Sequence, residues 1–154
     1  CAAKDVGRAR RLFARVCDGR WRLPDPLVVG AGCSSLGTLL RAGEGGVKDA
    51  GAARKRYRRA CNLGYGAGCR DLAQLWFFGQ GGARNPVRAR QYFRRGCDKA
   101  SPRACFGLAL MMGAGMGGAR DSARAQLLAD AACRDGVKRA CRYKPPGRDK
   151  KRPR

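Results

Sequence analysis

Apolar and small residues recur along the chain with the spacing of one face of an α-helix, at positions i, i+3, i+4, i+7 and i+8. The clearest series consists of Ala89, Tyr92, Phe93, Gly96 and Cys97. Residues 9–17, 53–61 and 125–133 show a similar spacing, and Arg and Lys fill the opposite faces. The pattern therefore predicts four amphipathic helices whose outer faces are basic.

Helix start and stop signals bracket these segments. Short polar side chains that can accept the free N–H groups of a first turn stand near each start, at Asp5, Asp49, Asn85 and Asp121. A second apolar series follows, in residues 69–76 for example, and it ends at a glycine cluster such as residues 79–82. Glycine readily adopts the left-handed conformation that ends a helix. Each unit is therefore predicted to be a helical hairpin.

The hairpins repeat every 36 residues. Two cysteine columns mark the repeat, one with Cys33, Cys69, Cys105 and Cys141 and one with Cys61, Cys97 and Cys133. Cys17 belongs to the second column but lies eight residues too early, which predicts an inserted loop at residues 18–32. Repeats of this length are typical of solenoids. The sequence thus predicts an all-α fold, an α-solenoid of about three and a half units over residues 1–143, with a basic, disordered tail at 144–154.

Charge and composition narrow the chemistry. The 154 residues include 34 Lys and Arg, 11 Asp and Glu and no His, which gives a formal net charge of +23. Without His there is no Ser-His-Asp or Cys-His nucleophile pair and no His-containing zinc site. The charge favours polyanionic partners, although a composition rich in Arg, Ala and Gly equally fits solvated helix faces. No run of 18 apolar residues occurs, so no membrane-spanning helix is predicted.

Eight of the nine cysteines can pair across the predicted turns. Cys61 and Cys69 flank a single turn between antiparallel helices, where a local disulfide is feasible. The same logic gives three more pairs: Cys17 with Cys33, Cys97 with Cys105, and Cys133 with Cys141. Zinc binding fits less well because seven intervening residues are too many for a zinc knuckle, and free buried cysteines would not need two periodic columns. Disulfides predict an oxidising compartment, namely the periplasm, the cell surface or the medium.

Cys1 lies outside both columns, since the other units have Gly45, Gly81 and Gly117 at its position. If residue 1 is the mature N-terminus, this cysteine resembles the lipid-modified first residue of a bacterial lipoprotein. If the chain was trimmed at that point, Cys1 has no such meaning. Lipidation of Cys1 is therefore an expectation that depends on where the mature chain begins.

The repeat resembles a known family. Its pattern, A-C-x-x-L-[GA]-x-L-x-x-x-G-x-G-G-x-x-[DN]-x-x-x-A-x-x-x-[YF]-x-x-x-C, is similar to the tetratricopeptide-like Sel1-like repeat. The paired cysteines resemble its secreted, cysteine-rich bacterial (Hcp-like) subfamily, and the resemblance covers residues 1–143. It implies a right-handed superhelix of disulfide-bridged helix pairs whose concave face holds peptides or proteins. The insertion with Trp21, Pro24 and Pro26 and the basic surface depart from the family.

Catalysis is an alternative, because some members of this subfamily are described as penicillin-binding and are labelled β-lactamases. A serine β-lactamase uses the motif S-x-x-K. No Lys stands three positions after Ser34, Ser35, Ser101 or Ser122. Glu44 is the only Glu and has no second carboxylate in its motif. We therefore expect a non-catalytic protein without a cofactor or a metal site, with penicillin binding and weak or no hydrolysis as the alternative.

Candidate ligand-binding residues are those that the core series does not claim. On the second helices, which the resemblance places along the concave face, they are Ser35, Thr38, Arg70, Gln74, Phe77, Phe106 and Leu110. The alternative for Phe77 and Phe106 is packing against an adjacent turn. Trp21 is a further candidate, because it stands beside two arginines in the insertion and such clusters are enriched at binding sites. Its alternative role is to cover the first hairpin.

Two classes of function follow. The first is a protein- or peptide-binding scaffold of the cell envelope or exterior, since a solenoid offers an extended surface and no motif offers chemistry. The second is a binder of nucleic acid or an acidic polymer. The basic residues expected on the outer, solvated helix faces are Arg54, Lys55, Arg58, Arg59, Arg88, Arg90, Arg94 and Arg95. Such a face predicts association with nucleic acid that is salt-dependent and unspecific.

Overall fold

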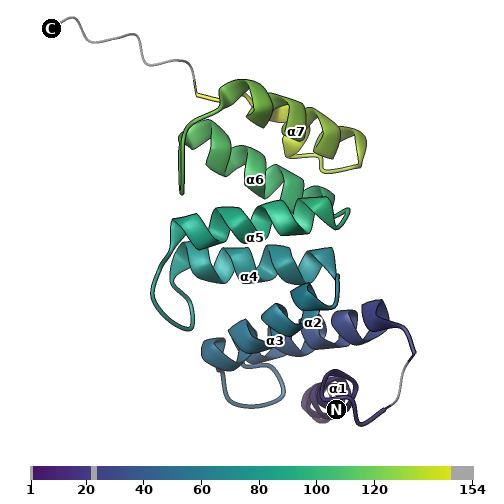
Figure 1. Cartoon of the computed structure of the whole chain (residues 1–154). Coiled ribbons are helices and arrows are strands. Elements are labelled where there is room, and N and C mark those ends of the chain that lie inside the picture. The colour runs from purple at the N-terminus through teal and green to yellow at the C-terminus, as the bar shows by residue number, and fades with distance from the viewer. Residues whose placement is uncertain (1, 22–23, 147–154) are drawn as a thin grey trace, which may run out of the picture.

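The protein is a curved stack of helices (Figure 1), seen here in a computed structural model that describes residues 2–21 and 24–146. The described part contains no β-strand. Its α-helices are α1 (Ala2–Cys17), α2 (Pro26–Ala42), α3 (Ala50–Asn62), α4 (Gly66–Phe78), α5 (Pro86–Asp98), α6 (Pro102–Ala114) and α7 (Ser122–Arg134). A short 3-10 helix, η1 (Ala140–Arg142), follows α7. The predicted all-α solenoid of helical hairpins is confirmed.

Short polar residues begin the helices as the sequence predicts, with one exception. The side chains of Asp49, Asn85 and Asp121 accept hydrogen bonds from the backbone N–H of the third residue of α3, α5 and α7, at 2.7 to 2.9 Å. Asp25 caps α2 in the same manner. Asp5, which was expected just before the first helix, instead lies in the first turn of α1. A carboxylate there still complements the positive end of the helix dipole.

Glycine loops end the second helix of each full hairpin. Gly43, Gly79 and Gly115 adopt left-handed φ values of 79°, 71° and 68° after α2, α4 and α6. Each loop then packs against the N-terminal part of the first helix in its own unit. A Cβ atom on Gly81 would lie 2.3 Å from the carbonyl oxygen of Ala50, so only glycine fits at this contact. The loops are therefore part of the packed structure.

Arginines on the first helices hold these loops in place. Arg54 donates hydrogen bonds to the carbonyl oxygens of Leu75 and Ala83, at 3.2 and 3.4 Å. Arg90 donates in the same way to Ala119 and Arg10 to Val47, at 2.9 and 3.2 Å. The expectation that Arg54 and Arg90 lie on a solvated face is thus wrong, because both are half-buried against a loop. The other six basic residues expected on this face are exposed.

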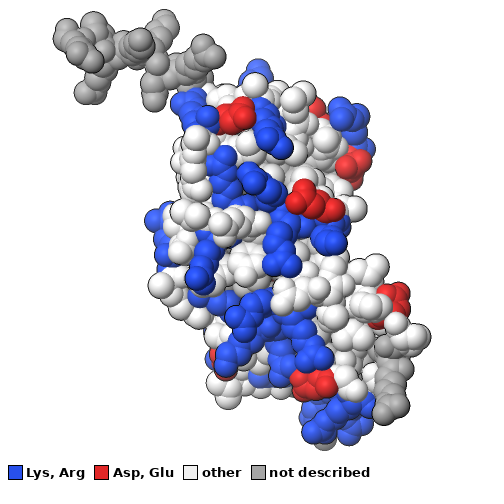
Figure 2. Space-filling model, viewed as in Figure 1, with Lys and Arg blue, Asp and Glu red and all other residues white. Residues whose placement is uncertain are grey.

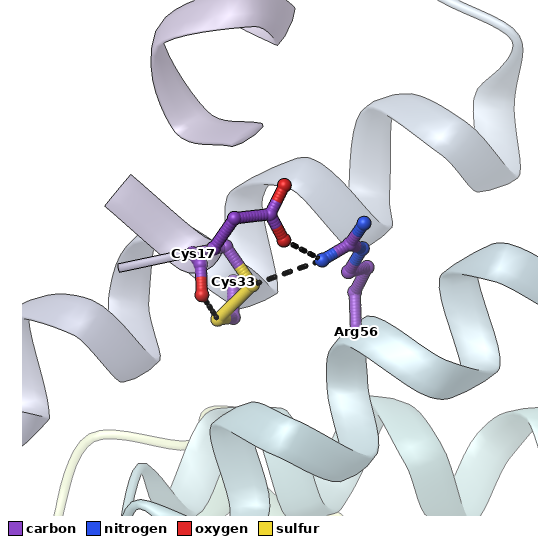
Figure 3. Close-up of polar contacts among 4 residues, drawn as sticks. Cys17, Cys33 and Arg56 are labelled. Atoms are coloured by element: carbon purple, nitrogen blue, oxygen red, sulfur yellow. Dashed lines mark hydrogen bonds and ion pairs between the residues drawn. A yellow bond between two sulfur atoms is a disulfide. The ribbon is translucent and has the colours of Figure 1, made fainter. Parts of the chain in front are cut away.

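Each hairpin carries a disulfide at its turn. The four bonds join Cys17 to Cys33, Cys61 to Cys69, Cys97 to Cys105 and Cys133 to Cys141, which are the predicted pairs. The Cα atoms of each pair are 4.5 to 4.8 Å apart. Figure 3 shows the first bridge, where the guanidinium of Arg56 forms an ion pair with Asp18 and contacts the sulfur of Cys17. This contact ties α3 to the end of α1.

Small residues allow the helices to approach so closely at the bridges. The residue before a bridged cysteine faces its counterpart on the other helix in the two middle hairpins, where the pairs are Ala60 with Gly68 and Gly96 with Ala104. A Cβ atom on Gly68 would lie 2.5 Å from the Cβ of Ala60, and one on Gly96 would lie 2.7 Å from that of Ala104. The disulfide and the small pair are therefore linked requirements of the repeat.

The core forms two clusters along the stack. One surrounds Tyr57 between α1 and α4, and the other surrounds Phe93 and Met111 between α4 and α7. Trp76 and Tyr92 pack against both clusters. Above the ring of Trp76 lie the guanidinium groups of Arg54 and Arg88, at 3.9 and 4.7 Å from its centroid. Burial, followed by the nearby charge of Arg88, lowers the pKa of Arg54 below its ordinary value.

The insertion differs from the predicted loop at residues 18–32. Helix α2 begins at Pro26, so the connection is shorter and residues 26–32 are helical. As a result α2 has 17 residues where α4 and α6 have 13. The sequence carries the physical reason, since Asp25 followed by Pro26 is a capping residue followed by proline at the first helical position.

The last unit is shortened, as expected, because η1 replaces a full second helix. Tyr143 covers the open end: its hydroxyl donates to the carbonyl oxygen of Ala109 at 3.3 Å, and its ring packs edge-on against Phe106. Burial raises the pKa of Tyr143, with an opposing contribution from Arg120. Cys1 and residues 147–154 lie outside the described residues. Among the helices that are described, none is long and apolar enough to span a membrane.

Candidate binding groove

A groove of about 1030 Å³ runs across the second helices α2, α4 and α6 and reaches the start of η1. Six of the eight candidate residues line it, namely Thr38, Arg70, Gln74, Phe77, Phe106 and Leu110. The helices bring these side chains together because they stack in parallel and present the same repeat positions to one side. Thr38, Gln74 and Leu110, for example, are separated by one repeat each.

The groove has two chemically different rims. Because α2, α4 and α6 run in the same direction, their N-terminal ends share one rim and their C-terminal ends share the other. The first rim carries Arg103 from α6 and Lys138 and Arg139 from the segment before η1. The opposite rim carries the aromatic rings of Phe77 and Phe78 at the end of α4, together with Arg41 at the end of α2. The two rings pack edge to face, 5.0 Å apart.

A polar network lies between the rims. Arg70 and Asp71 form an ion pair whose shortest N–O distance is 2.6 Å, and their side chains are 21% and 13% exposed. The second carboxylate oxygen of Asp71 accepts a hydrogen bond from the hydroxyl of Ser34 at 3.4 Å. Thr38 shares a hydrogen bond of 3.0 Å with the hydroxyl of Tyr57. The floor of the groove is therefore polar but already internally paired at these groups.

Two candidate residues lie outside the groove. Ser35 is half-buried on α2 and is absent from the groove lining. Trp21 stands in the connection between α1 and α2, where it is 44% exposed. The structure therefore does not bring Trp21 together with the other candidates, and its role as a ligand-binding residue stays a prediction.

Sequence reasoning missed several lining residues. Arg41, Phe78, Arg103, Lys138 and Arg139 all line the groove and were not candidates. A signal for two of them was present, because Arg103 and Arg139 stand one repeat apart at the same position. Lys138 and Arg139 belong to the shortened last unit. Because that unit has no full second helix, the helical pattern did not identify them as groove residues. Phe78 is 66% exposed, and it follows Phe77 at a position that the 3.6-residue pattern places on a different face.

A shallower hollow of about 550 Å³ continues the groove along the disulfide turns. Arg70, Arg103 and Val137 line both hollows. The turn residues Gly64, Ala100 and Gly136 repeat every 36 residues along its edge and have φ values of 87°, 54° and 88°. Ala100 is the one non-glycine residue with positive φ in the described chain. The hollow therefore extends the groove along the turn edge, past the second helices.

Comparison with known proteins gives a fold likeness. No protein-family model matches the sequence, and no curated protein matches it either. A Sel1 repeat protein from Oxalobacter formigenes matches the structure with a TM-score of 0.73 and 21% identity, over 90% of this chain and 56% of that one. Cysteine-rich protein B from Helicobacter pylori matches with a TM-score of 0.70 and 24% identity, over 92% of this chain and 96% of that one.

A third solved structure is similar, the c5321 protective antigen of uropathogenic Escherichia coli strains, which displays an SLR fold. It has a TM-score of 0.69 and 21% identity, over 90% of this chain and 32% of that one. The chain thus spans about half of the Oxalobacter protein and a third of the antigen, but nearly all of the Helicobacter protein. The fold is therefore that of a disulfide-bridged Sel1-repeat solenoid, as the cysteine spacing and the repeat pattern indicated.

Proposed function

We propose that this chain is a non-catalytic scaffold that holds a peptide, or an exposed segment of a protein, in the groove across α2, α4 and α6. The observation that carries the proposal is the groove itself, about 1030 Å³ in volume and lined by equivalent positions of successive repeats. That volume is at the upper end of the range for small-molecule pockets, about 300 to 1000 Å³. A long ligand that extends along the stack fits such a surface.

The way the groove is built supports binding without a large entropic cost. Its side chains stand mainly on helices, and a disulfide ties each helix to its neighbour at the turn. A rigid surface loses little freedom when a ligand binds, so more of the contact energy becomes affinity. The Sel1-repeat and cysteine-rich neighbours support this type of scaffold through their shared fold.

The proposed location is an oxidising compartment outside the cytoplasm. The four disulfides support it, because thiols are kept reduced in the cytosol. The periplasm, the cell surface and the medium all satisfy this condition. A lipid anchor at Cys1 is a prediction for which mass spectrometry of the protein from its native host is the direct measurement.

A peptide-display selection against the oxidised protein tests the proposed function. Leu110→Trp places a bulky ring at an exposed groove position, and Val87→Trp makes the same kind of change on the outer helix α5. We expect selected peptides to lose about tenfold or more in affinity for Leu110→Trp, because the ring occupies ligand space, and to bind Val87→Trp like the unmodified protein. Peptides that are indifferent to both substitutions would refute the proposal.

A second candidate function is polyanion binding by the outer helices. Helix α3 carries exposed Lys55, Arg58 and Arg59 and contains no acidic residue. Figure 2 shows Lys and Arg side chains in a broad band over the visible face, with few acidic side chains between them. We expect this face to bind DNA with an affinity that falls steeply as the salt concentration rises, and at the same rate for every DNA sequence.

A further inference from the structure

The groove carries a strong excess of free positive charge. Arg41, Arg103, Lys138 and Arg139 line it, and none of these four side chains has an ion-pair or hydrogen-bond partner among the described residues. All four are exposed. They come from three different parts of the chain, so the fold and not a local sequence run collects them on this surface.

The one acidic side chain in the described lining cannot neutralise them. Asp71 is already paired with Arg70 at 2.6 Å and accepts the hydroxyl of Ser34 at 3.4 Å. The charge of this carboxylate is therefore used within the floor. Cations held near an apolar wall attract an opposite charge more strongly than cations surrounded by water, because the low dielectric of the wall reduces screening.

Apolar surface is available in the same groove, at the C-terminal rim and on α6. Phe78 is 66% exposed and Leu110 is 39% exposed, and the half-buried Met116 lies beside them in the lining. A ligand that matches both the unpaired cations and the exposed apolar groups must carry negative charge and apolar side chains.

We propose that the groove selects an acidic peptide segment that also carries bulky apolar side chains, its carboxylates meeting Arg103, Lys138 and Arg139 and its apolar side chains meeting Phe78 and Leu110. This inference rests on the proposed peptide-binding function and specifies the chemistry of the ligand. An extended peptide suits the two rims because its successive side chains point to opposite sides. Alternating acidic and apolar residues would then address both rims at once.

The aromatic groups of the groove favour a peptide over single-stranded nucleic acid. Binding of single strands uses open aromatic faces on which bases stack. Here Phe77 has the guanidinium of Arg84 over its ring, 5.5 Å from the centroid, and forms an edge-to-face pair with Phe78. The ring of Phe106 is packed against Tyr143.

The test is fluorescence anisotropy with labelled octapeptides at about 150 mM salt, where the screening length is about 8 Å and distant surface charges contribute little. Glu-Leu alternating peptides are compared with Gln-Leu, Lys-Leu and Glu-Gln peptides of the same length. We expect the Glu-Leu peptide to bind about tenfold or more tightly than each of the others, since it alone satisfies both rims.

Two charge-matched double variants locate the interaction. Arg103→Glu/Arg139→Glu reverses two groove charges one repeat apart, and Arg58→Glu/Arg94→Glu reverses two outer charges with the same separation. We expect the groove variant to lose at least about tenfold in affinity for the Glu-Leu peptide, and the outer variant to lose less than about threefold. Circular dichroism checks that both fold, and Arg103→Gln/Arg139→Gln provides a milder groove variant.

Four results would overturn the inference. Equal losses in the two double variants would show that only net charge attracts the peptide. Preference for the Gln-Leu or Lys-Leu peptide would show that the groove does not read carboxylates, and displacement of the peptide by oligothymidylate at equal concentration would favour nucleic acid. If display-selected peptides depend on Leu110 but are not acidic, this inference fails while the proposed peptide-binding function stands.

Discussion

Arginine has different roles in two regions of this molecule, the outer first helices and the groove. On the outer helices Arg54 and Arg90 donate to backbone carbonyl oxygens of the glycine loops and are half-buried. In the groove Arg103 and Arg139 are exposed and have no such partner within residues 2–21 and 24–146. Both pairs stand one repeat apart. Periodicity of a charged residue therefore does not indicate function until its hydrogen-bond partners are known.

The largest expected effect comes from the disulfides, on which both regions depend. Each bridge stabilises the fold by roughly 2 to 3 kcal/mol in the chain-entropy model, since it restricts the unfolded chain. We therefore expect full reduction to abolish much of the helical signal in far-ultraviolet circular dichroism. Alkylated, reduced protein serves as the sample and the oxidised protein as the control. An unchanged spectrum would contradict a structural role for the bridges.

The second effect separates the packed glycine loops from the edge of the groove. Gly81 and Gly136 have φ values of 73° and 88°. A Cβ atom on Gly81 would collide with the backbone of Ala50, whereas one on Gly136 would have no atom within 4 Å. We expect Gly81→Ala to lower the free energy of unfolding by about 2 to 3 kcal/mol and Gly136→Ala by about 1 kcal/mol, measured by urea denaturation. Equal losses would show that the loop contact contributes nothing.

The third effect tests the arginine contacts within one helix. Arg54 donates to two carbonyl oxygens and lies over Trp76, whereas Arg58 on the same helix is exposed. We expect Arg54→Ala to cost about 1 to 2 kcal/mol of unfolding free energy and Arg58→Ala less than about 0.5 kcal/mol. If the two substitutions cost the same, the distinction between a loop-holding arginine and a solvated one is wrong.

The smallest effect is a gain in stability at the turn edge. Ala100 has a φ of 54°, where the equivalent residues of the neighbouring repeats are Gly64 and Gly136. Glycine adopts this conformation without strain, although it also makes the unfolded chain more flexible. We expect Ala100→Gly to raise the free energy of unfolding by about 0.5 to 1 kcal/mol. A loss of stability would show that Ala100 is not strained.

The repeat could be predicted from the sequence because several independent signals share its period. The cysteine columns, the capping residues and the glycine clusters all recur every 36 residues, and each has a local physical cause. Predictions were weaker where the period is broken. Helix α2 starts six residues before the end of the predicted loop, although Asp25 and Pro26 carry a local start signal.

The groove was only partly predictable for a related reason. Residues on the free face of the second helices follow from the 3.6-residue pattern, which identified Thr38, Gln74 and Leu110. Lys138 and Arg139 reach the groove because η1 replaces a helix, and Arg54 leaves the solvated face because a loop folds over it. Both outcomes depend on contacts between repeats, which a pattern within one repeat does not contain.

The central claim is that the groove, and not the basic outer face, is the binding surface. Backbone amide chemical shifts of the oxidised, isotope-labelled protein, recorded while a display-selected peptide is added, test it directly. The account predicts saturable shifts along α4 and α6 and in residues 136–139, with little change in the exposed parts of α3 and α5. Saturable shifts confined to the outer faces of α3 and α5 would contradict it.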